Sequence, residues 1–185
     1  MKLNLGCRNK IIEWYINVDK FDLYNVDVKH DLETFPYQFE DDSVKEIILS
    51  HVLEHIGQSP EIFIKILKEL YRICKNQALI KISVPHPRHD NFISDPKHVR
   101  PITIFGLSLF DRDLNEKWEK NGAANTPLAF IHNVNFSIED SSYDLEDVIL
   151  KKFNTGEIDK PKLDYMIKHY NNVVTQINIK WRVIK

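Results

Sequence analysis

Short apolar runs, each ended by a polar or turn residue, recur through the first half of the chain and constrain its fold most. They are rich in β-branched residues and occupy positions 3–5, 15–18, 26–28, 44–49 and 79–84. Runs of this length bounded by turn residues are typical of buried strands. The pattern therefore predicts five strands in the first half.

The clearest helix signal lies between the last two of these strands. Ser59 is a good N-cap, and Pro60 occupies the first helical position, where its missing N–H has no consequence. An apolar stripe with helical spacing follows and ends near Asn76: Phe63, Ile66, Leu67, Leu70 and Cys74. Strand, helix and strand in succession form a βαβ unit, which predicts a parallel pair of strands.

The second half of the chain has a different pattern. Residues 86–128 hold four prolines and little periodicity, which predicts an ordered excursion with a short helix near 101–111. A strand is expected at 130–138 and a helix at 161–172. Residues 173–183 alternate apolar and polar side chains, as an antiparallel strand with one wet face does. We therefore predict an α/β, Rossmann-like, mostly parallel sheet of about seven strands with an antiparallel C-terminal strand.

Charge and composition narrow the class of protein. The chain has 185 residues, which suits a single domain over 1–185. Its 25 basic and 27 acidic residues give a net charge of −2, so no nucleic-acid partner is expected. Cys7 and Cys74 cannot form a disulfide framework. No apolar stretch suggests a signal peptide or a membrane span, so we expect a cytoplasmic protein that acts on a small molecule.

Polar and small residues follow the predicted strands, where open α/β sheets bind ligands. Gly6 allows close approach of a ligand, Asp19 suits two vicinal ribose hydroxyls, and Asp31 suits an exocyclic base amine. Each alone is equally an ordinary turn or cap, but three on successive strands favour a nucleoside site. We expect Asp19→Ala to weaken ligand binding with little effect on stability. The strand-end residues that could face such a ligand are Gly6, Cys7, Arg8, Asp19, Lys20, Asp31, Leu32, Ser50 and His51.

Several segments resemble class I S-adenosylmethionine-dependent methyltransferases of the compact type. They are KLNLGC at 2–7, YINVD at 15–19, HDLE at 30–33, DSVKEI at 42–47 and SHVLEHI at 50–56. The resemblance is close over residues 2–85 and extends to the rest in outline. It implies S-adenosylmethionine as cofactor and methyl transfer as activity, with no metal required.

The same resemblance assigns roles to the strand-end residues. Gly6 and Cys7 would line the methionine end of the cofactor, and Asp19 would hold the ribose. Asp31 and Leu32 would frame the adenine, and Ser50 with His51 would lie near the sulfonium.

Two departures from the family stand out. Arg8 replaces a usual glycine, so its side chain must turn away or pair with the cofactor carboxylate. The connection between the first two strands is too short for a helical crossover, so the first helix is expected to be short or missing.

Two alternative functions remain open. His51, Glu54 and His55 form an H-x-x-E-H string, which on a helix would suit a zinc hydrolase. Gly57 and Pro60 interrupt any long helix there, which disfavours that reading. The other alternative is a non-catalytic binding or scaffolding module, favoured by Arg8 and the missing first helix.

Histidines are dense around the predicted strand ends. They either belong to a polar, solvated loop or act as proton acceptors in catalysis. Histidine titrates near neutrality and suits removal of a proton from a hydroxyl or amine acceptor. Candidate catalytic residues are His98, His51, His55 and His86. We expect residues 86–128 to cover the site, with Arg100 as an anion clamp or paired with Asp95. The acceptor would be a small molecule or a glycan-type compound.

Overall fold

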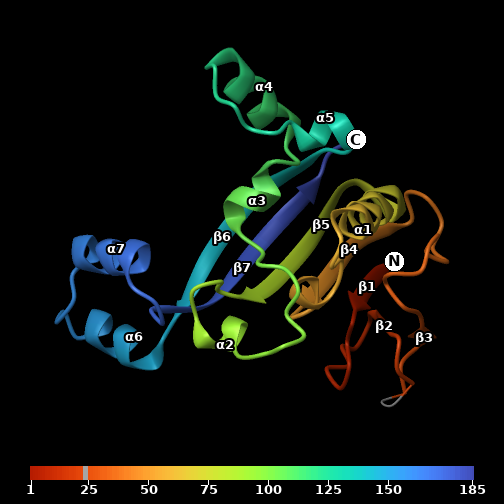
Figure 1. The fold of residues 1–185 in the computed structure, drawn as a ribbon. Helices are drawn as coiled ribbons and strands as arrows, with labels where there is room; N and C mark the ends of the chain where they lie inside the picture. The colour runs from red at the N-terminus through yellow and green to blue at the C-terminus, as the bar shows by residue number, and fades with distance from the viewer. Residues whose placement is uncertain (23–24) are drawn as a thin grey trace.

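The computed structural model describes residues 1–22 and 25–185. Seven strands form one sheet in the order β3-β2-β1-β4-β5-β7-β6 (Figure 1). Neighbours from β3 to β5 run parallel, whereas β7 is antiparallel to both β5 and β6. The predicted α/β class and antiparallel C-terminal strand are confirmed. The strands are β1 (Lys2–Leu5), β2 (Ile16–Asp19), β3 (Val28–Lys29), β4 (Val44–Ser50), β5 (Cys74–Pro85), β6 (Phe136–Leu145) and β7 (Val174–Val183).

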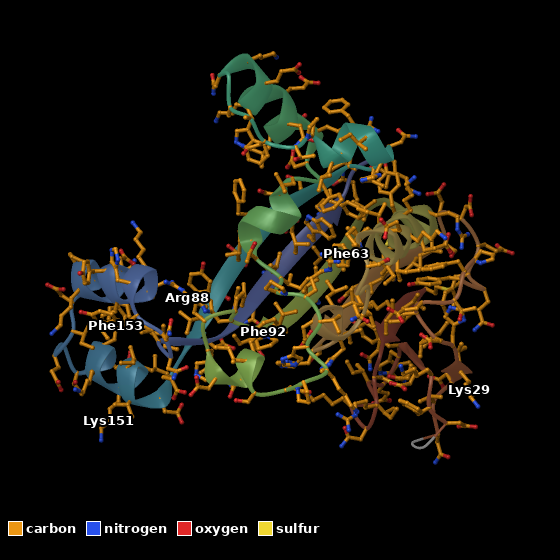
Figure 2. The ribbon with its side chains drawn as sticks, viewed as in Figure 1. Lys29, Phe63, Arg88, Phe92, Lys151 and Phe153 are labelled. Atoms are coloured by element: carbon orange, nitrogen blue, oxygen red, sulfur yellow. The ribbon has the colours of Figure 1, made fainter. Side chains whose placement is uncertain are left out.

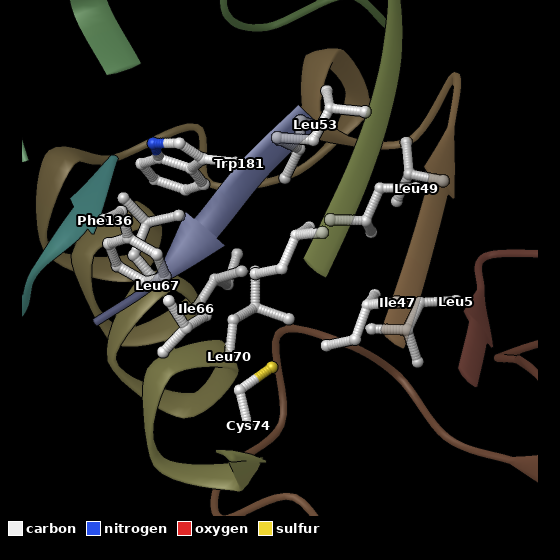
Figure 3. Packing of buried hydrophobic residues seen from close by; sticks show 14 of the residues in the cluster. Leu5, Ile47, Leu49, Leu53, Ile66, Leu67, Leu70, Cys74, Phe136 and Trp181 are labelled. Carbon is white, nitrogen blue, oxygen red and sulfur yellow. The ribbon is translucent and has the colours of Figure 1, made fainter. Parts of the chain in front are cut away.

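The predicted central helix forms as α1 (Pro60–Ile73) and covers one face of the sheet. Ser59 Oγ accepts a hydrogen bond from the Ile62 amide, as expected of an N-cap. The apolar stripe of α1 packs against β1, β4 and β7 in the main core (Figure 3). Trp181 of β7 and Phe136 of β6 stack there with ring centroids 4.0 Å apart. The core thus joins the parallel and antiparallel parts of the sheet.

Between β1 and β4, the described residues form no helix, which confirms the missing first helix. Buried amides hold the β1–β2 connection instead. Asn4 Nδ2 donates to Asn17 Oδ1 at 2.9 Å and to the Lys10 carbonyl at 2.7 Å. The Ile12 amide in turn donates to Asn17 Oδ1. The loop is therefore fixed to the sheet by side-chain hydrogen bonds rather than by an apolar helix face.

One predicted strand is wrong in position. Residues 128–132 form α5 (Leu128–His132), and Asn133 ends it in the left-handed conformation with φ of 53°. The strand begins only at Phe136 and continues through an exposed, polar stretch to Leu145. Pairing with β7 stabilises this edge strand where apolar side chains do not.

The expected helix at 161–172 forms as α7 (Lys160–His169) and ends earlier. The remaining helical segments are η1 (Leu53–His55), α2 (Asp90–Ile93), α3 (Ile104–Ser108), α4 (Arg112–Lys120) and α6 (Asp147–Asn154). The short helix expected near 101–111 is α3.

The excursion after β5 divides between the two ends of the sheet. Residues 86–100 stay at the carboxyl end of β5, where the His86 amide donates to the Thr175 carbonyl. By contrast, Phe110 accepts from the Phe136 amide near the start of β5, and α4 and α5 lie beyond that end (Figure 1). Only residues 86–100 therefore lie where the predicted cover of the site is needed.

Candidate functional site

Gly6 makes the turn at the carboxyl end of β1. Its φ is 66°, a conformation that favours glycine, and its amide donates to the Val18 carbonyl at 2.8 Å. A Cβ at this position would lie 2.7 Å from Val52 Cγ2. The backbone at the end of β1 is therefore closely packed and has room only for glycine.

Arg8 occupies its glycine-like position with a φ of 45°. Its side chain is exposed, and among the described residues it makes no ion pair. Of the two predicted arrangements, pairing with a cofactor carboxylate stays a prediction. Cys7, by contrast, is 4% exposed, and burial raises the pKa of its thiol, so it stays protonated at neutral pH.

Asp19 ends β2 with a carboxylate that the backbone already holds. Its Oδ2 accepts from the Arg8 amide and its Oδ1 from the Phe21 amide, both at 2.9 Å. The residue is only 5% exposed. These contacts argue against the expectation that Asp19→Ala changes stability little, because the carboxylate holds the β1–β2 connection. Each oxygen retains a further lone pair for a ligand.

A hollow of about 620 Å³ lies at the ends of β2 and β3. Its lining residues are Lys20, Phe21, Lys29, His30, Asp31 and Thr34. His30 Nε2 is buried without a hydrogen-bond partner, and Asp31 Oδ1 accepts from the Glu33 amide. Leu32 does not line the hollow as predicted; it is 7% exposed and packs into the main core. Its apolar side chain is more stable there than beside polar strand ends.

A second hollow, of about 470 Å³, lies at the ends of β4, β5 and β7. It is lined by His51, Pro85, Asn91, His98, Asp144, Thr175 and Gln176. His51 follows β4 with a φ of 56°, and its amide donates to the Ser83 carbonyl. Ser50 is half-buried and pairs with Ser83 across the sheet. Two of the four candidate catalytic histidines thus share this hollow.

The other two candidate histidines lie close by. The rings of His55 and His98 approach to 4.5 Å between centroids. His86 directly follows Pro85, and its Nδ1 accepts from the Arg88 amide at 3.2 Å. Burial, aided by the charge of Arg88, lowers the pKa of His86, so its ring is neutral at pH 7.

Arg88 and His89 anchor this segment to the helices beyond β6. The Arg88 guanidinium donates to the carbonyls of Ile167 and Lys168 at the end of α7 (Figure 2). His89 Nε2 lies 2.8 Å from Glu146 Oε1 beside α6. The wall of the second hollow is therefore tied to two further elements.

Arg100 is not placed as an anion clamp. Its guanidinium donates twice to the Gly57 carbonyl, at 2.8 and 3.2 Å, and lies 4.4 Å over the ring of Phe63. Nor does it pair with Asp95, whose Oδ1 accepts from the Lys97 amide. Arg100 instead fastens the excursion to the start of α1.

The helix required by a zinc hydrolase is not formed. His51 has left-handed backbone, and only Leu53–His55 make a single 3-10 turn. His51 and His55 therefore do not share a helix face, as the H-x-x-E-H motif requires.

The sequence also left some lining residues undetected. Asn91, Asp144 and Gln176 border the second hollow, yet each is an ordinary polar residue in its own segment. For Gln176, the alternating pattern of residues 173–183 predicted a strand but not a position beside a site. Only the antiparallel pairing of β5, β7 and β6 brings these positions together.

Neither known protein-family models nor curated protein sequences match this chain. Its fold, however, matches solved structures over nearly its whole length. A SAM-dependent methyltransferase from Archaeoglobus fulgidus has a TM-score of 0.61 at 18% identity, with 98% of this chain and 85% of the other covered. A second, from Methanosarcina mazei, has a TM-score of 0.55 at 11% identity, with 99% and 92% covered. The chain has the class I methyltransferase fold.

The methyltransferase fold also carries other chemistry. The cyclase SpnF matches with a TM-score of 0.50 at 11% identity, over 99% of this chain and 74% of the other. At such identities the likeness concerns the fold, and activity must be argued from the site. Within residues 1–22 and 25–185, no helix has the length and apolar character of a membrane span.

Proposed function

We propose that this protein is an S-adenosylmethionine-dependent methyltransferase acting on a small polar acceptor, a small molecule or glycan-type compound. One observation carries the proposal. Two hollows lie along the carboxyl edge of one sheet, at the ends of β2–β3 and of β4–β5–β7. In strand order β1 stands between them, where the order reverses. Open α/β sheets bind ligands at this reversal.

The first hollow suits the nucleoside part of the cofactor. Gly6 turns the chain at the end of β1, and Asp19, which directly precedes the lining residue Lys20, offers carboxylate oxygens for ribose hydroxyls. Asp31 supplies carboxylate oxygens for a base, and His30 lines the same hollow. When bound, S-adenosylmethionine supplies a methyl group already activated by its sulfonium. The protein's task is then to orient the acceptor and accept its proton.

The second hollow suits an acceptor that bears hydroxyl or amine groups. Asn91, Asp144 and Gln176 offer donors and acceptors around it. His98 Nδ1 lies 2.7 Å from the Phe92 carbonyl, which only accepts, so Nδ1 carries the proton. Nε2 of His98 then keeps its lone pair and can take a proton from the acceptor. We assign His98 as the general base, with His51, His55 and His86 as competing candidates.

The alternative is a non-catalytic module, or an enzyme of other chemistry, on the same fold. Isothermal titration with S-adenosylmethionine and S-adenosylhomocysteine distinguishes the two functions. A methyltransferase must bind both compounds, whereas a module that has lost the cofactor site binds neither. Transfer of a tritiated methyl group to sugars, sugar nucleotides and small amines then tests the activity. His98→Ala should keep cofactor affinity and abolish transfer. Binding of neither nucleoside would contradict the proposal.

A further inference from the structure

Glu54 is a fully buried carboxylate without a hydrogen-bond partner. It follows β4 in the turn η1 and is 0% exposed, and neither Oε1 nor Oε2 has a hydrogen-bond partner among the described residues, although His51 Nδ1 lies 3.3 Å from Oε1. Its main-chain carbonyl accepts from the Val99 amide at 2.8 Å, which brings the excursion over it. A buried charge is strongly unfavourable unless it is paired or binds a metal ion, and the half-exposed His51 contacts only one of the two oxygens.

Two imidazoles converge on this carboxylate from different segments. His55 follows Glu54, His98 belongs to the excursion, and one donor atom from each of the three residues lies within 4.8 Å of the others. The two rings are tilted by 55°. No hydrogen bond between the two rings explains their approach in this part of the structure.

Backbone carbonyls set the protonation of both rings. His98 Nδ1 faces the Phe92 carbonyl at 2.7 Å, and His55 Nδ1 faces the Lys97 carbonyl at 3.3 Å. A carbonyl accepts only, so Nδ1 is protonated in each ring and Nε2 carries the lone pair. Metal-binding histidines are commonly oriented by this kind of second hydrogen bond.

From this arrangement we infer that Glu54, His55 and His98 form a binding site for a divalent transition ion of the zinc class. Two neutral imidazoles and one carboxylate carry a total charge of −1, and a bound divalent ion would more than compensate this charge. Two histidines and one glutamate are the protein ligands of some zinc sites, in which water or substrate occupies the remaining coordination position. Ligand atoms around tetrahedral zinc are about 3.3 Å apart, so side-chain rotations must close the cluster. The site does not depend on methyl transfer. The ion would use the same Nε2 lone pair that His98 needs as a base, so the base role of His98 belongs to the metal-free protein.

Neighbouring charged groups fit this assignment. His51 Nδ1 lies 3.3 Å from Glu54 Oε1, which leaves Oε2 for the ion. Asp95 Oδ2 lies 3.9 Å from His98 Nε2, too far for a hydrogen bond but close enough to attract a cation. His55 is exposed, which gives the ion a path from solvent. A bound ion would join the end of β4 to the excursion beside the second hollow.

The test is calorimetric titration of the metal-free, tag-free full chain with ZnCl2. MgCl2 is the control titrant, because Mg²⁺ prefers oxygen ligands to imidazole nitrogens. We expect one zinc ion per chain, no magnesium binding, and visible absorption from Co²⁺ in a four-coordinate site. His55→Ala, an exposed change, and His98→Ala should each lower zinc affinity more than about 100-fold, beyond the usual effect of an outer partner. His169→Ala, at the exposed end of α7, is the matched control and should bind zinc normally.

Glu54→Gln separates binding from folding. The amide keeps the shape but removes the charge, so zinc affinity should fall while the thermal midpoint of the metal-free protein stays equal or rises. A lower midpoint would show that His51 alone neutralises the carboxylate and would overturn the site. Absence of zinc binding by the unmodified chain, or normal binding by His55→Ala and His98→Ala, would also overturn it.

Discussion

The backbone amide of Arg8 donates a 2.9 Å hydrogen bond to the carboxylate of Asp19. This contact joins the turn after β1 to the end of β2, the two places where the cofactor is proposed to lie. Because Arg8 contributes its amide rather than its side chain, the bond does not require the glycine that class I methyltransferases, which the sequence resembles, usually have at this position. Its φ of 45° shows that the backbone keeps the glycine-like conformation.

Asp19→Ala should therefore lower both stability and cofactor affinity. Two hydrogen bonds to a charged acceptor are lost, so unfolding in urea should be easier by at least about 2 kcal/mol. Cofactor binding should weaken by about 2–4 kcal/mol in calorimetry. Asp27→Ala is the control, because Asp27 also holds the backbone, through Asn17, but precedes β3 instead of standing at the carboxyl end of a strand. Equal cofactor affinity in the Asp19 variant would remove Asp19 from the ribose site.

Gly6→Ala should be more destabilising than Gly122→Ala. Both glycines have positive φ, 66° and 71°, which costs an alanine about 1–2 kcal/mol. Gly122 has nothing within 4 Å of an added Cβ, whereas Gly6 meets Val52. Overpacking should add about 1–3 kcal/mol at Gly6, measured by chemical denaturation. Val52→Ala in the same chain should recover this added part, and failure to recover it would contradict the close packing.

Arg100→Ala should destabilise the protein by about 1–3 kcal/mol, because two charge-assisted hydrogen bonds to Gly57 and the contact with Phe63 are lost. Arg100→Lys should recover little of this, since lysine lacks the planar fork. Urea denaturation measures both. If stability were unchanged while methyl transfer was lost, Arg100 would act on the acceptor and our structural assignment would be wrong.

Glu46 should make stability depend on acid pH. Burial disfavours its charge, but hydrogen bonds from Lys81, Tyr15 and Lys2 outweigh burial and lower the pKa of Glu46 from 4.5 to about 2. This folded-state pKa lies below the unfolded value, so the stabilisation is complete above pH 4.5 and is lost as pH falls towards 2.

Glu46→Gln should accordingly flatten this acid limb in unfolding free energies measured from pH 6 to pH 2.5. Glu157→Gln, which removes one partner of an exposed ion pair with Lys152, should leave it unchanged. An identical acid limb in the Glu46 variant and the parent would show that the Glu46 network does not stabilise the sheet.

The sequence predicted the sheet and α1 because their signals are local. The stripe from Phe63 to Cys74 and the alternation through Ile177, Ile179 and Trp181 each place one face in the core. Gly6, Asp19 and Asp31 were selected as candidates because each stands at or shortly after the end of an apolar run.

Non-local packing decided what the sequence did not reveal. The polar edge strand β6 is stabilised by pairing with β7, so its own residues carry little strand signal. Helix α6 was missed, although Ile149 and Phe153 have helical spacing and pack in a second small core. Glu54 is buried, and the Arg100 guanidinium donates to the Gly57 carbonyl, because residues 86–100 fold back over the end of β4. No local sequence pattern encodes this arrangement.

The most direct test of the central claim is a crystal structure of the protein grown with S-adenosylhomocysteine. We predict density along the ends of β1, β2 and β3, with the ribose beside Asp19 and the adenine in the hollow lined by Asp31 and His30. The thioether sulfur should point towards the second hollow beside His51. Crystals grown at saturating ligand that show no nucleoside in this groove, or show it bound elsewhere, would contradict the assignment of this edge as a methyltransferase site.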